Sequence, residues 1–133
     1  MYRSMVDPSP LVIATSGKFT FAIELRSGMT RWAYALKSDH TCRVVVANDK
    51  VYIAGQSELA SLEYATGREV FHINTDLGPD ITLLVDGDHI YVGSNGRVAC
   101  YGQFGERHWL NDLGTNAGIG FAVPGLAQQI DLR

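Results

Sequence analysis

The side chains that could carry out chemistry are few in this chain, and they stand far apart along it. The cysteines and histidines are Cys42, Cys100, His40, His72, His89 and His108. No two histidines are four residues apart, and none has a cysteine or histidine neighbour at a spacing typical of a metal site. No histidine or acid stands at a motif spacing that would activate either thiol. We therefore predict neither a metal site nor a cysteine nucleophile.

The short motifs of enzymes and cofactor-binding proteins are missing or incomplete. Asp86-Gly87-Asp88 begins like a calcium loop, but the further oxygen ligands and the glutamate at the twelfth position do not follow. The sequence contains no G-x-S-x-G elbow and no glycine-rich phosphate loop between a strand and a helix. Acidic residues are spread singly, which gives no sign of a paired-carboxylate hydrolase. We predict a protein that is not an enzyme and binds no cofactor.

Composition is typical of one soluble globular unit, with 133 residues of which 46% are hydrophobic and 19% charged. A net charge of −3 gives no basic surface, which argues against nucleic acid or an anionic membrane as partner. No apolar run approaches the roughly 20 residues that span a bilayer. The first eight residues lack the apolar core of a signal peptide, so the expected location is the cytoplasm.

The elements that must position these residues follow a repeat of about 39 residues. A glycine preceded by Ser, Thr or Phe recurs at separations of 39 and 38 residues, as Gly28, Gly67 and Gly105. An aromatic residue stands four positions after each glycine, as Trp32, Phe71 and Trp109. A period of about 20–50 residues marks architectures whose single unit cannot bury its apolar face alone. We interpret the aromatics as packing between units and not as stacking on a ligand.

The same repeat suggests a role for each cysteine. Ile23, Leu62 and Cys100 each stand five residues before a repeat glycine. We interpret Cys100 as a small buried hydrophobic residue in that column. Cys42 begins a strand beside a predicted loop, where we expect its thiol to be more accessible.

Each unit divides into short β-like runs separated by turn residues. The runs 43–47 and 81–85 are almost wholly apolar, as in strands buried on both faces. Asn48-Asp49 and Asp86-Gly87 follow and favour tight hairpins, because Asn, Asp and Gly tolerate positive φ. Three more strands are predicted in each of these units, at 51–54, 59–64 and 69–73 and at 90–93, 97–101 and 107–110. The pattern predicts an all-β fold of four-stranded antiparallel blades, with a β-sandwich as the alternative.

Three segments resemble the quinoprotein-like (PQQ-type) β-propeller repeat, as in the blades of outer-membrane assembly-factor-type propellers. They are Val92–Cys100, Ala22–Trp32 and Ser61–Phe71, and the resemblance extends from Leu11 to Val123. It implies a propeller fold. The family includes cofactor enzymes, membrane-protein assembly factors and sensor modules, so it implies no single activity. Its quinone-binding enzymes have long insertions and often adjacent cysteines, which this chain lacks, so we expect the fold without that chemistry.

Three blades are fewer than the four to eight of typical closed propellers, and an arc of three would leave two apolar faces bare. We predict that two chains form a six-bladed ring as a homodimer. Residues 11–15 resemble a blade's second strand, so the first blade lacks its own first strand. Residues 119–123 resemble a spare first strand that could complete the next subunit's first blade, although 127–132 also looks strand-like and competes for a place.

The predicted organisation is an N-terminal extension at 1–10 and a three-blade module at 11–133. The blades cover approximately 11–41, 42–80 and 81–118, followed by the spare strand at 119–123 and a tail at 124–133.

The function predicted from this organisation is a non-enzymatic interaction or ligand-sensing module, serving for example as a scaffold. Its unidentified protein or small-molecule ligand would bind where loops gather around the channel mouth. The candidate ligand-binding residues in those loops are Asp39, His40, Thr41, Asp76, Asp80, Thr115 and Asn116. The alternative is a subunit or fragment of a larger quinoprotein-type enzyme or assembly factor that another chain completes.

Overall fold

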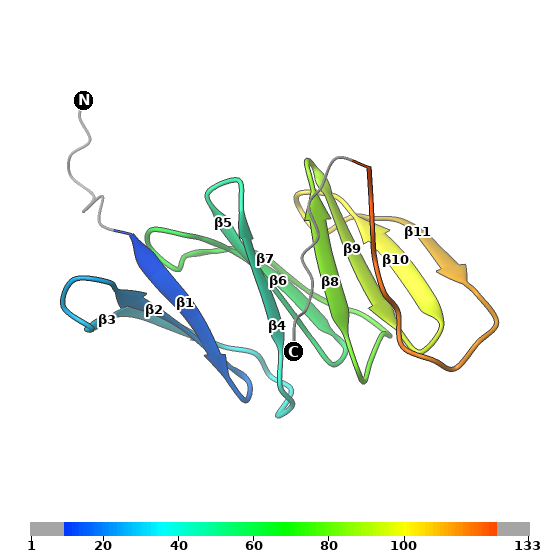
Figure 1. Cartoon of the computed structure of the whole chain (residues 1–133), viewed down its shortest axis with the longest axis horizontal. Coiled ribbons are helices and arrows are strands. Elements are labelled where there is room, and N and C mark those ends of the chain that lie inside the picture. The colour runs from blue at the N-terminus through cyan, green and yellow to red at the C-terminus, as the bar shows by residue number, and fades with distance from the viewer. Residues whose placement is uncertain (1–9, 125–133) are drawn as a thin grey trace.

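The computed structural model describes residues 10–124, which form eleven strands and no helix (Figure 1). The strands are β1 (Leu11–Ser16), β2 (Phe19–Glu24), β3 (Thr30–Ala35), β4 (Arg43–Ala47), β5 (Lys50–Gly55), β6 (Glu58–Glu63), β7 (Glu69–Asn74), β8 (Thr82–Asp86), β9 (His89–Ser94), β10 (Arg97–Tyr101) and β11 (Arg107–Asp112). They form three antiparallel sheets, in the orders β1-β2-β3, β4-β5-β6-β7 and β8-β9-β10-β11. The predicted all-β fold of three antiparallel blades is confirmed.

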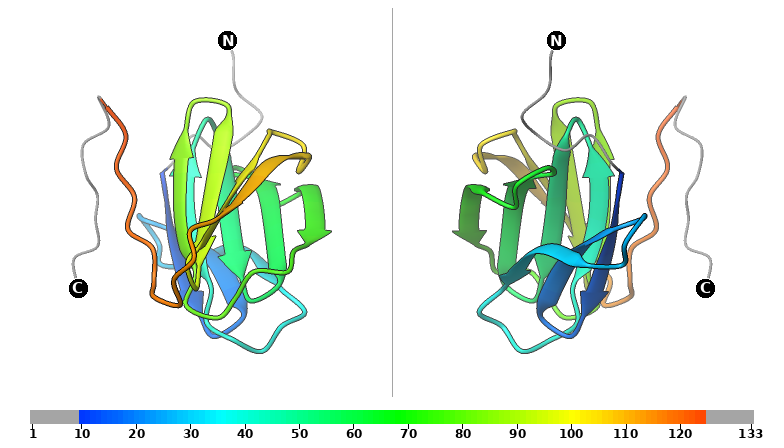
Figure 2. Two further views of the ribbon diagram at one scale, coloured as in Figure 1. Left: turned by 90° about the vertical axis from the view of Figure 1, so that its right-hand side faces the viewer. Right: turned by 90° about the vertical axis from the view of Figure 1, so that its left-hand side faces the viewer.

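The three sheets follow one another as an arc and pack face to face (Figures 1 and 2). Strand β4 contacts both β1 and β8, so these strands lie on the common inner side of the arc. Strands β3, β7 and β11 end the three sheets on the other side. This is the arrangement of consecutive propeller blades.

The hairpin turns adopt the backbone conformations that their residues favour. Asn48 and Asp49, between β4 and β5, have φ values of 57° and 60°. Asn95 and Gly96, between β9 and β10, have values of 47° and 75°. Paired positive φ values match the right-handed twist of the strands that a two-residue turn connects.

Two buried clusters fill the spaces between consecutive sheets. Val51 and Ile53 belong to the cluster shared with the first blade. Tyr52 and Ala54 belong to the cluster shared with the third. All four side chains are fully buried, because successive residues of a strand point to opposite faces and both faces of the middle sheet are covered.

The two ends of the arc differ from a complete blade. The first blade starts at the position of a second strand, since among the described residues β1 pairs with β2 alone. Residues 119–123, predicted as a spare strand, belong to none of the three sheets. A blade's first strand pairs with the second strand that follows it, and no such strand follows residue 123 among the described residues. The predicted strand at 127–132 lies outside the described residues, as do residues 1–9 of the extension and 125–133 of the tail.

The strand register corrects the position of Cys100 within the repeat. Cys100 pairs with Trp109 as Ser61 pairs with Phe71, so it corresponds to Ser61 and not to Leu62. The amide of Gly67 donates to the carbonyl of Glu63, four residues earlier, whereas the amide of Gly105 donates to that of Gly102, three residues earlier. Counting five residues back from Gly105 therefore reaches the equivalent of Ser61. Cys100 is buried as predicted, but on the face of the third blade that points away from the second.

Cys42 is less accessible than its position beside a loop suggested. Its side chain is buried, and Sγ lies 3.9 Å from the Thr20 hydroxyl. Leu36 and Cys42 both lie beside Gly55 of the second blade and belong to the buried cluster between the first and second blades. Burial raises the pKa of both the Cys42 and the Cys100 thiols, which disfavours the reactive thiolate.

Candidate functional site

The loops that leave the last strand of each blade are tied to a hairpin turn of the same blade. The amide of Leu36 donates to the Lys18 carbonyl at 3.1 Å, and the amide of Thr75 donates to the Ser57 carbonyl at 2.9 Å. In the third blade the amide of Leu113 donates to the Gly96 carbonyl at 2.7 Å. The same contact in all three blades gathers these loops and turns at one end of the sheets, which we call the loop face.

Each loop between two blades is also tied to the blade that follows it. The Ser94 hydroxyl donates to the Pro79 carbonyl at 2.6 Å, and the side-chain amide of Asn95 donates to the Gly78 carbonyl at 3.3 Å. The loop between the first and second blades is held by Glu58 of the second blade, whose carboxylate accepts hydrogen bonds from two amides of that loop. Loops fixed from two sides form a surface of defined shape, on which binding residues can be positioned.

Glu58 is a buried carboxylate at the centre of this network. It accepts hydrogen bonds from the amides of Lys37 and Ser38, at 2.9 and 2.5 Å, and its other close partner is Nε2 of His72 at 2.8 Å. Burial acts to raise the pKa of Glu58, but the hydrogen bonds from His72 and the two amides outweigh it. The pKa of Glu58 therefore lies below its ordinary value of 4.5.

Neither Glu58 nor His72 is among the residues predicted from the sequence. One signal was available, because Glu58 corresponds to Phe19 and Arg97, the first residues of the equivalent strands in the other blades. An acid at a position that is not acidic in the other repeats indicates a local role. That role is to hold the loop of the first blade against the second.

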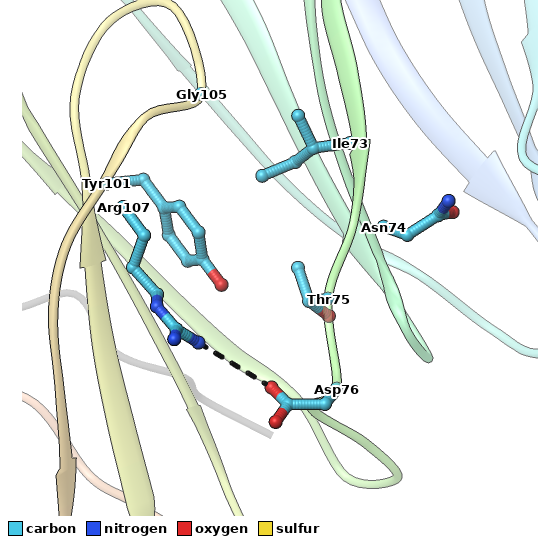
Figure 3. Close-up of a pocket in the computed structure, with 7 residues that line it drawn as sticks. All are labelled: Ile73, Asn74, Thr75, Asp76, Tyr101, Gly105 and Arg107. Atoms are coloured by element: carbon cyan, nitrogen blue, oxygen red, sulfur yellow. Dashed lines mark ion pairs between the residues drawn. The ribbon is translucent and has the colours of Figure 1, made fainter.

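Asp76 lies between two arginines on the loop face. Its carboxylate is 3.3 Å from the Arg97 guanidinium and 3.9 Å from that of Arg107, and Arg97 also donates to the Asp76 carbonyl. Asp76 and Arg107 border a hollow of about 470 Å³ between the second and third blades. Its lining residues are Ile73, Asn74, Thr75, Asp76, Tyr101, Gly105 and Arg107. Figure 3 shows the Asp76 and Arg107 side chains pointing toward one another across its opening, with the Tyr101 hydroxyl directed into the space between them.

The hollow has a simple origin in the repeat. Tyr34 and Ile73 are each the fifth residue of a blade's last strand. Between the first and second blades, the Tyr34 hydroxyl donates to Glu69 at 2.7 Å and bridges the blades. Ile73 is shorter and has no hydroxyl, so it cannot bridge to Arg107, which corresponds to Glu69. The hollow is therefore particular to one blade interface.

The seven candidate residues predicted from the sequence are spread over the two loops between blades and the segment that follows β11. Asp76 alone among them lines the hollow. Asp39 pairs with Lys18 at 3.3 Å and is not part of the lining of the hollow. The others are exposed loop residues that the structure does not bring into one pocket; they are His40, Thr41, Asp80, Thr115 and Asn116.

The repeated aromatic and glycine residues meet between blades. The indole of Trp32 lies on the Gly67 turn of the second blade, and its Nε1 donates to the Tyr64 carbonyl at 2.9 Å. Phe71 lies on the Gly105 turn of the third blade. In each pair the aromatic packs where only a residue without a Cβ leaves room.

Residues 10–124 contain no group of three or more His, Cys, Asp or Glu side chains arranged to hold a metal ion. Over the same residues, no helix is long and apolar enough to cross a membrane.

The sequence profile described as outer membrane protein assembly factor BamB matches residues 3–123. The chain belongs to this family. Among curated proteins, no sequence matches it. The structure of BamB from Moraxella catarrhalis is similar, with a TM-score of 0.63 and 18% identity over 88% of this chain and 37% of that chain.

Quinohemoprotein alcohol dehydrogenases are also structurally similar. The enzyme from Comamonas testosteroni has a TM-score of 0.60 and 25% identity, over 79% of this chain and 20% of that chain. Alcohol dehydrogenase ADHIIG from Pseudomonas putida HK5 has a TM-score of 0.63 and 19% identity, over 77% of this chain and 19% of that chain. The relatives thus include an assembly factor and enzymes, and this chain spans about a third or less of their lengths.

Proposed function

We propose that this chain is a non-enzymatic β-propeller interaction module. Two copies form a six-bladed ring, and the loop face binds a protein or a small ligand at the channel mouth. The observation that carries the proposal is the construction of the loop face, where each of the two loops between blades is hydrogen-bonded to the blade before it and the blade after it. A surface held in this way is suited to binding, since little conformational entropy is lost when a ligand docks.

The shape of the molecule favours a partner. The outward faces of the first and third blades expose large apolar side chains, among them Val12, Phe19 and Trp109. A monomer seldom leaves such faces open to water. Two arcs of three blades would cover both faces and give six blades, within the usual range for a closed ring.

A second candidate function follows from the lengths of the relatives. The chain matches 37% of BamB and about a fifth of the dehydrogenases, so it could form part of a larger propeller that other blades complete. Urea unfolding of the isolated chain separates the two candidates. A cooperative transition is expected for a self-sufficient module, whereas a chain without one would favour the fragment.

Ligand mapping tests the binding role directly. A library of small polar compounds is screened by ligand-observed NMR, and ¹⁵N spectra of the chain then locate each hit. We expect shifts at loop-face amides such as Ser57, Asp76 and Arg97. Shifts confined to the Gly67 turn, or no hits at all, would contradict the proposal. Arg97→Gln should weaken binding, while Arg68→Gln, in the Gly67 turn, serves as the matched control.

A further inference from the structure

The contact between an aromatic side chain and a glycine turn occurs twice within the chain. A Cβ added to Gly67 would lie 2.5 Å from the Trp32 ring, and one added to Gly105 would lie 2.8 Å from the Phe71 ring. Both aromatics are the third residue of a blade's last strand, and both glycines lie in the turn of the following blade. The contact therefore has a direction, from one blade to the next.

Among residues 10–124, each end of the arc carries one half of the same contact without the other half. Trp109 is the third residue of β11, and 45% of its surface is exposed. Gly28 lies in the equivalent turn of the first blade, with φ +76 as at Gly67, and a Cβ added to it would meet nothing within 4 Å.

The Gly28 turn also has the same internal hydrogen bond as the Gly67 turn. The amide of Gly28 donates to the Glu24 carbonyl at 2.8 Å, as the amide of Gly67 does to Glu63. The carbonyl of Leu25 therefore occupies the position of the Tyr64 carbonyl, which accepts the hydrogen bond from Trp32. An aromatic residue arriving at Gly28 would find both a site without a Cβ and an acceptor.

The outward face of the first blade is apolar beside the Gly28 turn's own strands. On the first blade, Val12 and Ile23 pair across β1 and β2 as Val51 and Leu62 pair across β5 and β6. Val51 and Leu62 are fully buried by the first blade, whereas Val12 is 44% exposed. The first blade thus presents toward its missing neighbour the same kind of face that the second blade buries.

The end of the described chain also matches what the first blade lacks. Ile119 lies against Gly93, and the Phe121 ring is 6.2 Å from Tyr91, so residues 119–121 pass over the outward face of the third blade. The left view of Figure 2 shows this segment, drawn in orange to red, on the β8 side of the third sheet, which is the inner side of the arc. After β7 of the second blade, the chain crosses in the same way and continues into β8, the innermost strand of the third blade. Strand β1 occupies the position of a second strand, and no first strand precedes it among the described residues.

We propose that Trp109 of one copy docks on the Gly28 turn of a second copy. Its indole donates to the Leu25 carbonyl of that copy, and residues 119–123 pair with β1 of the same copy. This inference rests on the proposed two-chain ring and specifies its interface. A second copy is the occupant that fits, because the third blade and residues 119–123 carry the aromatic and the spare segment that the first blade lacks among the described residues.

Trp109 fluorescence reports the docking directly. The chain has two tryptophans, and Trp32→Phe leaves Trp109 alone while keeping the type of ring that Phe71 places in the same contact. We expect Trp109 emission at short wavelength when the chain is concentrated and a shift to longer wavelength on dilution, in parallel with the fall in molar mass. Emission typical of exposed tryptophan in a dimer would overturn the inference.

Two variants test the two halves of the contact by sedimentation. Trp109→Ala removes the aromatic, and Gly28→Asn places a side chain where it would dock, with a residue that tolerates positive φ. Each alone should raise the dimer Kd at least about tenfold, as expected for a central tryptophan. Their mixture should associate more tightly than either, because one of its two interfaces has both Trp109 and Gly28. Gly87→Asn is the matched control, since Gly87 also has positive φ and open space.

The outcomes separate this inference from the proposed function. A wild-type dimer whose two variants associate as tightly as the wild type would overturn the docking and leave the ring standing. A wild-type chain that stays monomeric would overturn the ring and the docking with it. Complementation in the mixture is the result that only the head-to-tail contact predicts.

Discussion

Trp32, Phe71 and Trp109 occupy the same position in their strands but have different surroundings. Trp32 and Phe71 are buried against the turn of the next blade, whereas Trp109 is 45% exposed at the end of the arc. The spacing in the sequence predicts the shared position, because the repeat sets it. It does not predict the difference, because that depends on which blade comes next.

Replacing Trp32 tests the packing role at the scale of one residue. Trp32→Ala should lower the free energy of unfolding by about 3–5 kcal/mol, since it removes a large buried ring and its hydrogen bond to Tyr64. Trp109→Ala, measured where the chain is monomeric, should cost much less. Urea denaturation of both variants provides the measurement, and equal losses would show that the two rings have the same surroundings.

Glu58 should give the protein a stability that depends on pH. Its pKa is lower in the folded chain than the ordinary 4.5, so its ionised form stabilises the fold above that value. Glu58→Gln should cost about 1–3 kcal/mol at pH 7, because the carboxylate accepts from two amides and lies against His72. The difference from the wild type should shrink as the pH falls below 4.5 toward the lowered pKa.

Thermal unfolding between pH 3 and pH 7 measures this effect. Glu63→Gln is the matched control, because Glu63 pairs with Arg68 at an exposed turn and its loss should change the stability little. A constant difference between wild type and Glu58→Gln across this range would contradict the assignment.

At the scale of elements, the sequence predicted the strands and turns well. The apolar runs at 43–47 and 81–85 are β4 and, shifted by one residue, β8. Asn, Asp and Gly mark the turns because few other residues adopt positive φ. The hollow beside Asp76 was not predicted, because it arises from the size difference between Ile73 and Tyr34 at one interface.

A pair of glycine variants tests how the blades are joined. Gly67→Ala should destabilise the chain by about 1–3 kcal/mol more than Gly87→Ala. Both residues have positive φ, so both variants carry backbone strain, but only the methyl group at Gly67 would meet the Trp32 ring. Chemical denaturation measures the two costs. Equal costs would mean that the turn conformation alone requires the glycine.

At the scale of the whole molecule, the family and the arc of three blades fit together. The chain belongs to the BamB family but spans 37% of the BamB chain from Moraxella catarrhalis. The number of blades could be predicted from the repeat. The repeat does not predict what packs on the outward faces of the first and third blades, because each repeat specifies only its own strands and turns. Residues 119–123 pair with no strand among the described residues.

Sedimentation equilibrium of the purified wild-type chain tests the two-chain ring most directly. One chain has a mass of 14.6 kDa, and the ring predicts twice that mass, about 29 kDa, with dissociation only on dilution. A cooperatively folded chain that sediments as a 14.6 kDa monomer at every concentration would contradict the account.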